Sequence, residues 1–503
     1  MVSCEISDFR QERGIMQQRK RIGERLIEAG LITQEQLEFS LQEQKKTGEL
    51  LGAILFSHGF ISQKDLFTML SMSYSGEYAK PREEEMDLPQ DIRDIVMQSS
   101  AVLRTTIREP EKVSDLLMAP IVRLVERIIV TGIKKGATDI HIGPDVKGTR
   151  VRYRIDGLLQ HAMYLPKDVL PAIVSRVKIM GSMNIAESRV PQDGAMEFSW
   201  ESRSLDIRIS TFPLMGGENI VMRLLDKTQI LLGLENLGFL INDIETIKKA
   251  LNVPYGMIIV TGPTGSGKTT TLYSALSTIN SVFKNIFTIE DPVEYQLPLI
   301  RQSQVNVKAG LTFASGLRSI LRQDPDVILV GEMRDMETAE LAIRSALTGH
   351  LVFTTLHTNN ATSSLPRLMD MGVEPFLLAS TIDTIISQRL LRVLCKSCRE
   401  EYVPAKALRA SLGIPIPDDA VFFRARGCEK CSDTGYRGRT IIYELLKMNE
   451  PLRNLVLAKS GSDTLADAAK ENGMEPMYEI GIKKVILGIT SLEEVLSTTR
   501  TSF

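Results

Sequence analysis

The stretch from Met257 to Leu272 reads Met-Ile-Ile-Val-Thr-Gly-Pro-Thr-Gly-Ser-Gly-Lys-Thr-Thr-Thr-Leu. Its apolar start is typical of a buried strand, and a helical pattern follows from Thr270 to Asn280. The residues between them match the phosphate-loop pattern. The sequence therefore predicts that a nucleoside triphosphate binds at Gly262, Pro263, Thr264, Gly265, Ser266, Gly267, Lys268, Thr269 and Thr270.

The residue types in this loop follow from the chemistry of phosphate binding. Glycines let the backbone curl so that its N–H groups point at phosphate oxygens, and the helix N-terminus adds positive potential. Lys268 is expected to reach the terminal phosphates, and the Thr269 hydroxyl to bind Mg²⁺. A glycine-rich turn that matches by chance is the alternative, which the flanking strand and helix make the weaker interpretation.

The composition is ordinary for a soluble globular protein. The 503 residues are 43% hydrophobic and 24% charged, and this length allows about three or four domains. A formal net charge of −2 gives no global basic excess for nucleic acid or an anionic membrane. No apolar run reaches the ~18 residues of a membrane span, and Met1–Lys20 lacks the apolar core of a secretory signal. We expect a cytoplasmic location.

A repeated pattern occupies the N-terminal region. The segment Arg21–Gly30 recurs at an offset of 29 residues as Leu50–Gly59. Each copy is typical of a helix, a glycine stop, an N-cap at Thr33 or Ser62, and a second helix. The pattern predicts a helical tandem-repeat domain over residues 1–80, and a charged, proline-punctuated linker over residues 81–112.

Residues 113–232 are predicted to form a small α+β domain. A helical pattern over Val113–Lys135 is followed by alternating segments at Asp139–Ile142, Val151–Ile155, Leu205–Ile209 and Ile220–Leu225. Arginines alternate with apolar residues in these strands, so one polar face is expected to gather Arg152, Arg154, Arg208 and Arg223. A solvated basic face is the plain alternative for any one of them.

Two apolar strands that follow the phosphate loop end in acids. Asp291 and Glu294 come directly after Ile286–Glu290, and Glu332 comes directly after the apolar segment 327–331. In an open parallel sheet the carboxyl ends of the strands line the ligand crevice, so these acids are expected to face the phosphates. Carboxylates suit Mg²⁺, and one of them must orient or deprotonate the attacking water.

Four of the five cysteines form two Cys-x-x-Cys pairs separated by 29 residues: Cys395, Cys398, Cys428 and Cys431. This pattern predicts a structural zinc site with four protein ligands, in a module over residues 392–440. Reduced free thiols and a redox pair are the alternatives, and Cys4 is left without a partner. Helices are expected to follow, with starts near Ser462 and Thr490.

Several of these blocks together resemble the ATPases of type II secretion and type IV pilus assembly, from about Val113 to the C-terminus. The segments Thr138–His141, Arg154–Gly157, Pro191–Gly194 and Arg208–Pro213 are similar to the domain that precedes the motor in that family, and Leu311–Asp326 is similar to a motor signature. The resemblance implies a RecA-like P-loop ATPase domain over residues 233–503 that contains the zinc module.

The resemblance also implies roles for individual residues. Glu294 corresponds to the base that activates water, and Glu332 to the Walker B acid near Mg²⁺. The family's two other groups are arginines that reach the triphosphate across a closed interface and a pair of histidines that sense the terminal phosphate; here these are Arg208, Arg223, His350 and His357. Supporting acids are Glu290 and Asp291. A lone histidine is more often packed or solvated.

The N-terminal repeat resembles the cyclic di-GMP-binding domain found on some of these ATPases. The first copy implies ligand contacts by Arg21, Gly23, Leu26, Gly30, Leu31 and Gln44. The second copy departs from the family at Leu50, where arginine is frequent, and at Ser73, where glutamine is frequent.

Taken together, the resemblance implies a homo-hexameric ATPase that uses Mg²⁺ and Zn²⁺ and drives pseudopilus or pilus assembly. Its partners would be inner-membrane platform and recruiting proteins, which would bring the chain to the membrane. Two other functions remain open: a cyclic di-GMP-sensing scaffold with an inactive motor, and a nucleic-acid motor. The intact Lys268, Glu294 and Glu332 argue against the first, and the near-neutral charge against the second.

Overall fold

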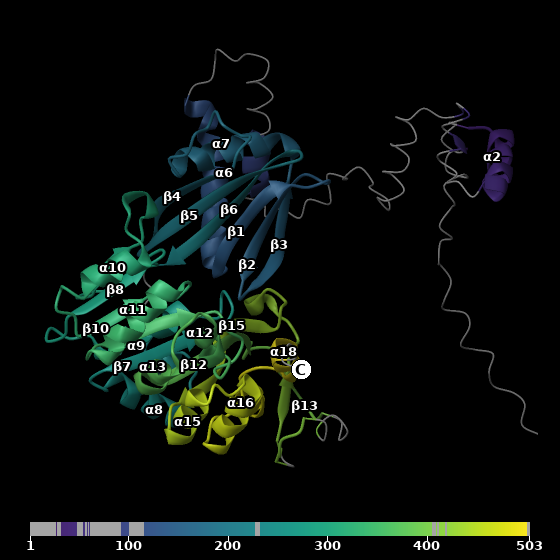
Figure 1. Cartoon of the computed structure of the whole chain (residues 1–503). Coiled ribbons are helices and arrows are strands. Elements are labelled where there is room, and N and C mark those ends of the chain that lie inside the picture. Colours follow the sequence, from purple (N-terminus) through teal and green to yellow (C-terminus); the bar gives the residue numbers. More distant parts are fainter. Residues whose placement is uncertain are drawn as a thin grey trace, which may run out of the picture.

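The computed structural model describes residues 32–47, 92–99 and 115–499, with gaps at 227–231, 405–408, 410–411 and 418–419, and a few isolated positions before residue 61. Two large sheets organise the chain (Figure 1). The first belongs to residues 115–226, here called the middle domain, and the second to residues 232–499, here called the motor domain. No helix in these described ranges is long and apolar enough to cross a membrane.

Helix α2 (Gln34–Thr47) represents the N-terminal repeat in the described residues. The Gln36 N–H donates to Thr33 Oγ1 at 3.2 Å, and the Thr33 N–H donates to Gln36 Oε1 at 2.8 Å. This reciprocal capping confirms the predicted N-cap at Thr33. The other residues of the cyclic di-GMP prediction lie outside the described part of the chain, as does the side chain of Gln44: Arg21, Gly23, Leu26, Gly30, Leu31, Leu50 and Ser73.

The middle domain is an antiparallel sheet of order β3-β2-β1-β6-β5-β4, with helices on one face. Its strands are β1 (Ala137–Pro144), β2 (Thr149–Ile155), β3 (Leu158–Leu165), β4 (Gln192–Trp200), β5 (Arg203–Leu214) and β6 (Gly217–Asp226). Helices α6 (Asp115–Lys134) and α7 (Leu170–Met180) cover the apolar face. The four predicted strands are present. Strands β3 and β4 were not among the predicted strands, although Met196, Phe198 and Trp200 alternate with polar residues in β4.

The motor domain is a mostly parallel sheet of order β15-β12-β7-β11-β10-β8-β9. The parallel strands are β7 (Gly256–Thr261), β8 (Ile286–Glu290), β9 (Arg301–Gln304), β10 (Val327–Val330), β11 (Leu351–Leu356) and β12 (Ile382–Leu394). Strand β15 (Tyr436–Lys447) pairs antiparallel with β12. A separate ribbon joins β13 (Glu400–Tyr402) to β14 (Phe422–Arg424). Because β7 is central and buried along its whole length, it reads as a continuous apolar run.

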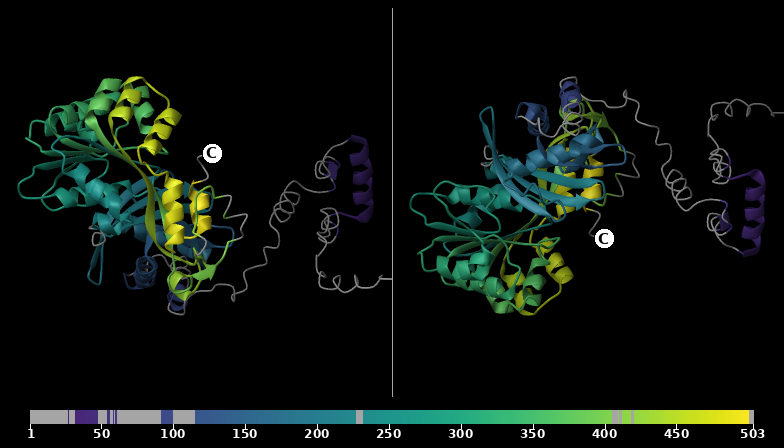
Figure 2. Two further views of the ribbon diagram at one scale, coloured as in Figure 1. Left: turned by 90° about the horizontal axis from the view of Figure 1, so that it is seen from below. Right: turned by 90° about the horizontal axis from the view of Figure 1, so that it is seen from above.

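Helices cover both faces of the motor sheet. One face packs against α8 (Ile241–Leu251), α9 (Lys268–Ile279), α17 (Met477–Ile486) and α18 (Leu492–Thr499). The other packs against α10 (Phe313–Ile320), α11 (Met336–Leu347), α12 (Ser364–Asp370), α13 (Pro375–Thr381), α15 (Glu450–Leu457) and α16 (Ser462–Glu471). Figure 2 shows the middle domain lying against the motor domain from two further directions. The parallel order places the carboxyl ends of β7, β8, β10 and β11 on one edge of the sheet.

Candidate active site at the phosphate loop

The phosphate loop lies between β7 and α9, at the centre of the motor sheet. Gly262, Gly265 and Gly267 have φ values of 145°, 80° and 87°, which favour glycine. A Cβ on Gly262 would also lie 2.4 Å from the carbonyl oxygen of Gln388. The curled backbone therefore needs glycine for two reasons, conformation and space, and it ends at the N-terminus of α9.

The side chains of the loop leave a polar centre. Lys268 Nζ donates to the carbonyl oxygens of Gly262 at 2.8 Å and Pro263 at 3.2 Å. Burial lowers the pKa of Lys268, and the nearby Glu332 carboxylate opposes that shift. Ser266 Oγ is buried and has no hydrogen-bond partner within the described residues. An unpartnered hydroxyl beside a retracted lysine suits an incoming phosphate, which would supply acceptors to both.

The remaining predicted loop residues differ in exposure. Pro263, Thr264 and Gly265 form the exposed tip of the loop. Thr269 and Thr270 are half-buried in the first turn of α9.

Glu332 and His357 lie at the carboxyl edge of the sheet, as predicted. Glu332 follows β10, and its Oε2 is 3.6 Å from His357 Nε2. Its Oε1 is 2.5 Å from Arg334 Nη2. The Glu332 carboxylate thus lies beside the His357 imidazole, and it is near enough to Lys268 to oppose the lowering of that lysine's pKa.

His350 lies at the opposite edge of the sheet from His357, with β11 between them, and the shared part of this pair in sensing the terminal phosphate stays a prediction. His350 precedes β11, where its Nδ1 is 2.9 Å from the Ser345 carbonyl oxygen, whereas His357 follows β11. An extended strand of this length separates its ends by about 20 Å. The two histidines therefore cannot contact the same phosphate within one subunit.

Glu294 is paired with an arginine of the middle domain. Its Oε2 is 3.0 Å from Arg208 Nη1, and Arg208 Nη2 donates to the Val293 carbonyl oxygen at 3.0 Å. Both side chains are about one third exposed, at 33% for Arg208 and 31% for Glu294. The proposed catalytic base and an arginine predicted to reach the nucleotide thus neutralise each other across the two domains.

The predicted arginine face exists, and a buried aspartate organises it. The strand register aligns Arg154, Asp139, Arg223 and Arg208 in one row on the sheet face opposite the helices. Arg223 Nε donates to Asp139 Oδ1 at 3.1 Å, and Arg154 Nε is 3.7 Å from Asp139 Oδ2. Asp139 therefore holds Arg223 on the sheet and reduces its repulsion from Arg208.

The two predicted supporting acids lie in different surroundings. Glu290 is buried, and it accepts hydrogen bonds from Tyr273 Oη, from Thr288 Oγ1 at 2.5 Å and from Gln302 Nε2 at 3.2 Å. Burial raises the pKa of Glu290 despite these donors. Asp291 is exposed at the end of β8. These hydrogen bonds hold Glu290 at the end of β8, four residues before Glu294, and they occupy its carboxylate with protein donors.

Gln388 belongs to the site although the sequence analysis did not identify it. It is fully buried in β12, where its Nε2 donates to the Ser266 carbonyl oxygen and its Oε1 accepts from Thr271 Oγ1, both at 2.8 Å. Both ends of the amide therefore brace the phosphate loop. The available signal was a polar side chain inside the apolar run of β12.

The four predicted zinc ligands form a cluster. Their sulfur atoms all lie within 4.8 Å of one another, and the Cys395–Cys428, Cys398–Cys431 and Cys428–Cys431 pairs are 3.9, 3.8 and 3.7 Å apart. Four sulfurs around one zinc at about 2.3 Å would be separated by about 3.8 Å. Burial opposes ionisation of Cys431, but the N–H groups of Cys428 and Gly435 and the neighbouring thiols lower its pKa to about 7. The cluster fits a thiolate-bound metal.

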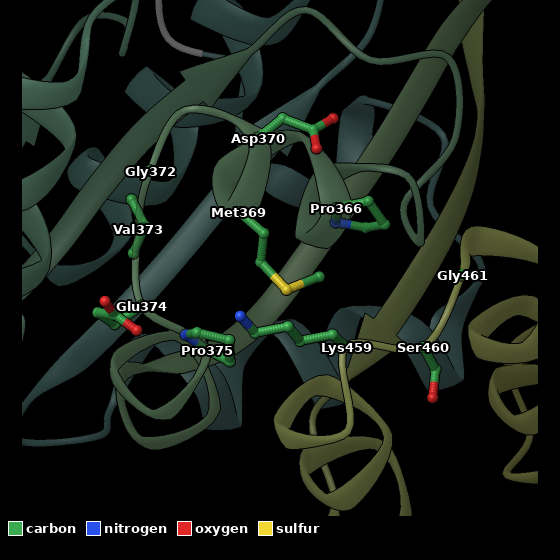
Figure 3. Close-up of a pocket in the computed structure, with 10 residues that line it drawn as sticks. All are labelled: Pro366, Met369, Asp370, Gly372, Val373, Glu374, Pro375, Lys459, Ser460 and Gly461. Atoms are coloured by element: carbon green, nitrogen blue, oxygen red, sulfur yellow. The ribbon is translucent and has the colours of Figure 1, made fainter.

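A cavity of about 470 Å³ lies elsewhere on the motor domain, between the α12–α13 connection and the α15–α16 turn (Figure 3). Lys459 extends across it toward Glu374 and Pro375. Its lining includes Met369 and Asp370 but no residue of the phosphate loop. The cavity is therefore separate from the candidate active site.

Comparison with known proteins identifies the family. Residues 115–497 match the family described as Type II/IV secretion system protein. The chain belongs to this family. It is 47% identical over 382 residues to the Type II secretion system protein E of Pseudomonas aeruginosa, with 76% of each chain covered. It is 44% identical over 417 residues to the type IV pilus assembly ATPase PilB of Myxococcus xanthus, covering 81% of this chain and 74% of the relative.

A solved structure agrees with this assignment. The pilus retraction motor PilT, solved with bound ADP, is 29% identical with a TM-score of 0.51, covering 75% of this chain and 96% of that one. The chain is thus an ATP-hydrolysing member of the Type II/IV secretion family and a secretion or pilus motor. This assignment disfavours the inactive scaffold and the nucleic-acid motor.

The bracing role of Gln388 predicts a specific defect. Replacing Gln388 by Ala leaves the Ser266 carbonyl oxygen and the Thr271 hydroxyl without their buried partner, at about 1–3 kcal/mol each. We expect Gln388→Ala to weaken nucleotide affinity by about tenfold or more, measured by titration with a fluorescent ATP analogue. Ser380→Ala, which removes only an exposed hydroxyl on α13, is the control. Unchanged affinity in a folded Gln388→Ala variant would contradict the bracing role.

Proposed function

We propose that the chain is one subunit of a homo-hexameric ATPase that powers assembly of a type II secretion pseudopilus or a type IV pilus. The observation that supports this most directly is the Arg208–Glu294 contact, which joins the candidate base of the motor domain to a guanidinium of the middle domain. A site built from two domains couples hydrolysis to their relative position. The names of the relatives, a secretion protein and a pilus assembly ATPase, indicate the machine.

Each residue of the site has a place in this mechanism. The phosphate loop holds the β- and γ-phosphates, and Lys268 leaves its backbone acceptors to bind them. Thr269, with Glu332 nearby, would hold Mg²⁺, which would supply positive charge to the phosphate oxygens. Glu294 orients and deprotonates the attacking water. His357, beside Glu332, responds to the presence of the terminal phosphate.

The arginines act when the domains close. As long as Arg208 is paired with Glu294, the base is neutralised and the guanidinium is unavailable to phosphate. Closure of the middle domain onto bound ATP transfers Arg208 to the γ-phosphate and frees Glu294 for water. Arg223, its neighbour across the strands, adds a second positive charge. Hydrolysis and phosphate release then let the first pairing return, which resets the domain position.

A ring gives this domain movement a direction. Each subunit of a closed ring constrains its neighbours, so that sequential closure produces rotation. We propose that inner-membrane platform and recruiting proteins receive this movement and hold the ring at the cytoplasmic side of the membrane. His350 lies away from its own subunit's phosphate loop, and a neighbouring subunit is the remaining route by which it would reach a nucleotide.

The assigned base predicts a separation of binding from turnover. Glu294→Gln retains the size of the side chain but removes its basicity, so ATP hydrolysis is expected to fall by about 100-fold or more. Nucleotide affinity is expected to stay within about threefold of that of the unaltered protein. Phosphate release by the assembled protein and analogue titration measure the two quantities.

The exposed Glu340 provides a matched control for this substitution. It lies on α11, where it pairs with Arg344, and Glu340→Gln is expected to leave both turnover and affinity unchanged. Full turnover by Glu294→Gln would show that another group activates the water. No turnover by the unaltered protein in any assembled form would contradict the motor itself.

We further propose that the cysteine cluster binds one structural zinc ion. All four ligands come from the protein, so no coordination position remains for a reacting water. The metal would tie β12, which ends near Cys395, to the segment that leads into β15. A redox function fits less well, because the sulfur–sulfur separations match shared coordination.

The zinc proposal predicts one bound metal per chain. Cys398→Ser is expected to reduce the zinc content measured by mass spectrometry from one equivalent to well below one half, and to lower the melting temperature. Cys4→Ser, which alters the fifth cysteine, is expected to retain one equivalent. Zinc-free unaltered protein that melts at the same temperature after chelation would contradict the site.

We also propose that the N-terminal repeat binds cyclic di-GMP through the first copy. The helical capping at Thr33 agrees with the repeat pattern on which this proposal rests. Calorimetry with the full chain is expected to show heat of binding at micromolar protein, and Arg21→Ala is expected to weaken it at least tenfold, because a guanidinium–phosphate contact is lost. The absence of heat with the unaltered chain would end this proposal.

A further inference from the structure

A second polar contact joins the two domains at a different place. Asp156 lies in the turn between β2 and β3, where its Oδ2 accepts the Gly438 N–H at 2.8 Å. Its Oδ1 is 3.8 Å from Arg439 Nε. Gly438 and Arg439 are at the start of β15, and Figure 1 shows the end of β2 directed toward the motor domain beside this strand. The contact lies far from the phosphate loop in sequence and involves no residue assigned to catalysis.

The turn that carries Asp156 is held in one conformation. Asp156 and Gly157 have φ values of 48° and 85°, the left-handed pair of a two-residue hairpin turn. Arg154 Nη1 donates to the Gly157 carbonyl oxygen at 2.9 Å, which ties the turn to the arginine row. The backbone of Asp156 therefore belongs to a fixed turn and moves with the middle-domain sheet.

The motor side of this contact is also where the chain enters the motor domain. The Ile441 N–H donates to the Leu237 carbonyl oxygen at 3.3 Å, and the buried Lys484 Nζ donates to the carbonyl oxygens of Gly238 at 2.5 Å and Ile441 at 2.6 Å. The segment that follows the middle domain is thus fastened to β15 within a few residues of Gly438. The segment that connects the two domains and the Asp156 side chain therefore both contact β15.

The cysteine cluster anchors the segment that immediately precedes the start of β15. The Cys395 N–H donates to the Gly435 carbonyl oxygen at 2.9 Å, and the Gly435 N–H donates to Cys431 Sγ at 3.2 Å. Gly435 is three residues before Gly438. The backbone that offers its N–H to Asp156 is therefore fixed on both sides.

Nucleotide binding is expected to affect the Arg208–Glu294 contact and the Asp156–Gly438 contact differently. Arg208 must leave Glu294 for the γ-phosphate in the proposed cycle, whereas Asp156 and Gly438 belong neither to the phosphate loop nor to the acids beside it, so that no step of the cycle draws either of them to the nucleotide. A rigid sheet that changes one contact and keeps the other must turn about the contact that it keeps.

We propose that Asp156 is a positioning residue, the pivot on Gly438 about which the middle domain turns while Arg208 moves from Glu294 to the nucleotide. This inference rests on the proposed motor function, because it describes how that motor moves. The carboxylate suits a pivot, since one oxygen with several lone pairs keeps its hydrogen bond as the donor direction changes. Arg439 holds the charge near the donor throughout the rotation.

Hydrogen exchange at Gly438 tests the pivot directly. In the full-length assembled protein, we expect the Gly438 amide to remain protected without nucleotide, with ADP and with a non-hydrolysable ATP analogue. Amides around Val293 and Glu294 are expected to change their exchange between these states. Loss of Gly438 protection on analogue binding would overturn the pivot, because the contact would then break during closure. A full-length chain that never hydrolyses ATP would instead contradict the proposed function.

Substitutions separate a pivot from a merely structural contact. Asp156→Ala removes the acceptor, and we expect Gly438 exchange to rise about tenfold or more and kcat to fall, with KM unchanged because the phosphate loop is intact. Asp156→Asn retains an acceptor oxygen and is expected to restore protection and most of kcat. Asp145→Ala, in the turn at the other end of β2, is the matched control and should change neither. Equal kcat for Asp156→Ala and the unaltered protein would overturn the proposal.

Discussion

The ion pair between Arg208 and Glu294 is the interaction on which the proposed cycle depends. Each partner comes from a different domain, and each has a second possible partner in a bound nucleotide or its attacking water. With about one third of each side chain exposed, the pair stabilises the open arrangement by no more than about 1 kcal/mol. A pair of this strength holds the resting state and still yields to a triphosphate.

The pairing of β12 with β15 connects the other parts of the molecule. Gln388 in β12 braces the phosphate loop from one side of the ladder. In the partner strand β15, Gly438 receives Asp156, and Ile441 fastens the segment that leads from the middle domain. In this ladder Gln388 pairs with Tyr443 and Arg392 pairs with Arg439. The two pairs are four residues apart along each strand, which is about 13 Å. The middle domain therefore contacts the same pair of strands that supports the nucleotide site.

The two faces of the middle-domain sheet have different roles. Its apolar face is covered by α6 and α7, which leaves the opposite face free for charge. The register places Asp139 between Arg154 and Arg223, and this buried acid keeps neighbouring guanidinium groups ordered on a crowded surface. An arginine that is already oriented loses less conformational entropy when it moves to a phosphate.

The sequence by itself determined the local chemistry. Strand β7, the phosphate loop, the start of α9, the acids after β8 and β10, the two cysteine pairs and the N-cap at Thr33 were predicted because each depends on neighbouring residues or a fixed short spacing. Only the tertiary structure decided which groups meet. It surrounded Glu290 with protein donors, and brought Gln388 and Asp156 to partners more than one hundred residues away. Such contacts arise from strand order and domain packing, which no local pattern specifies.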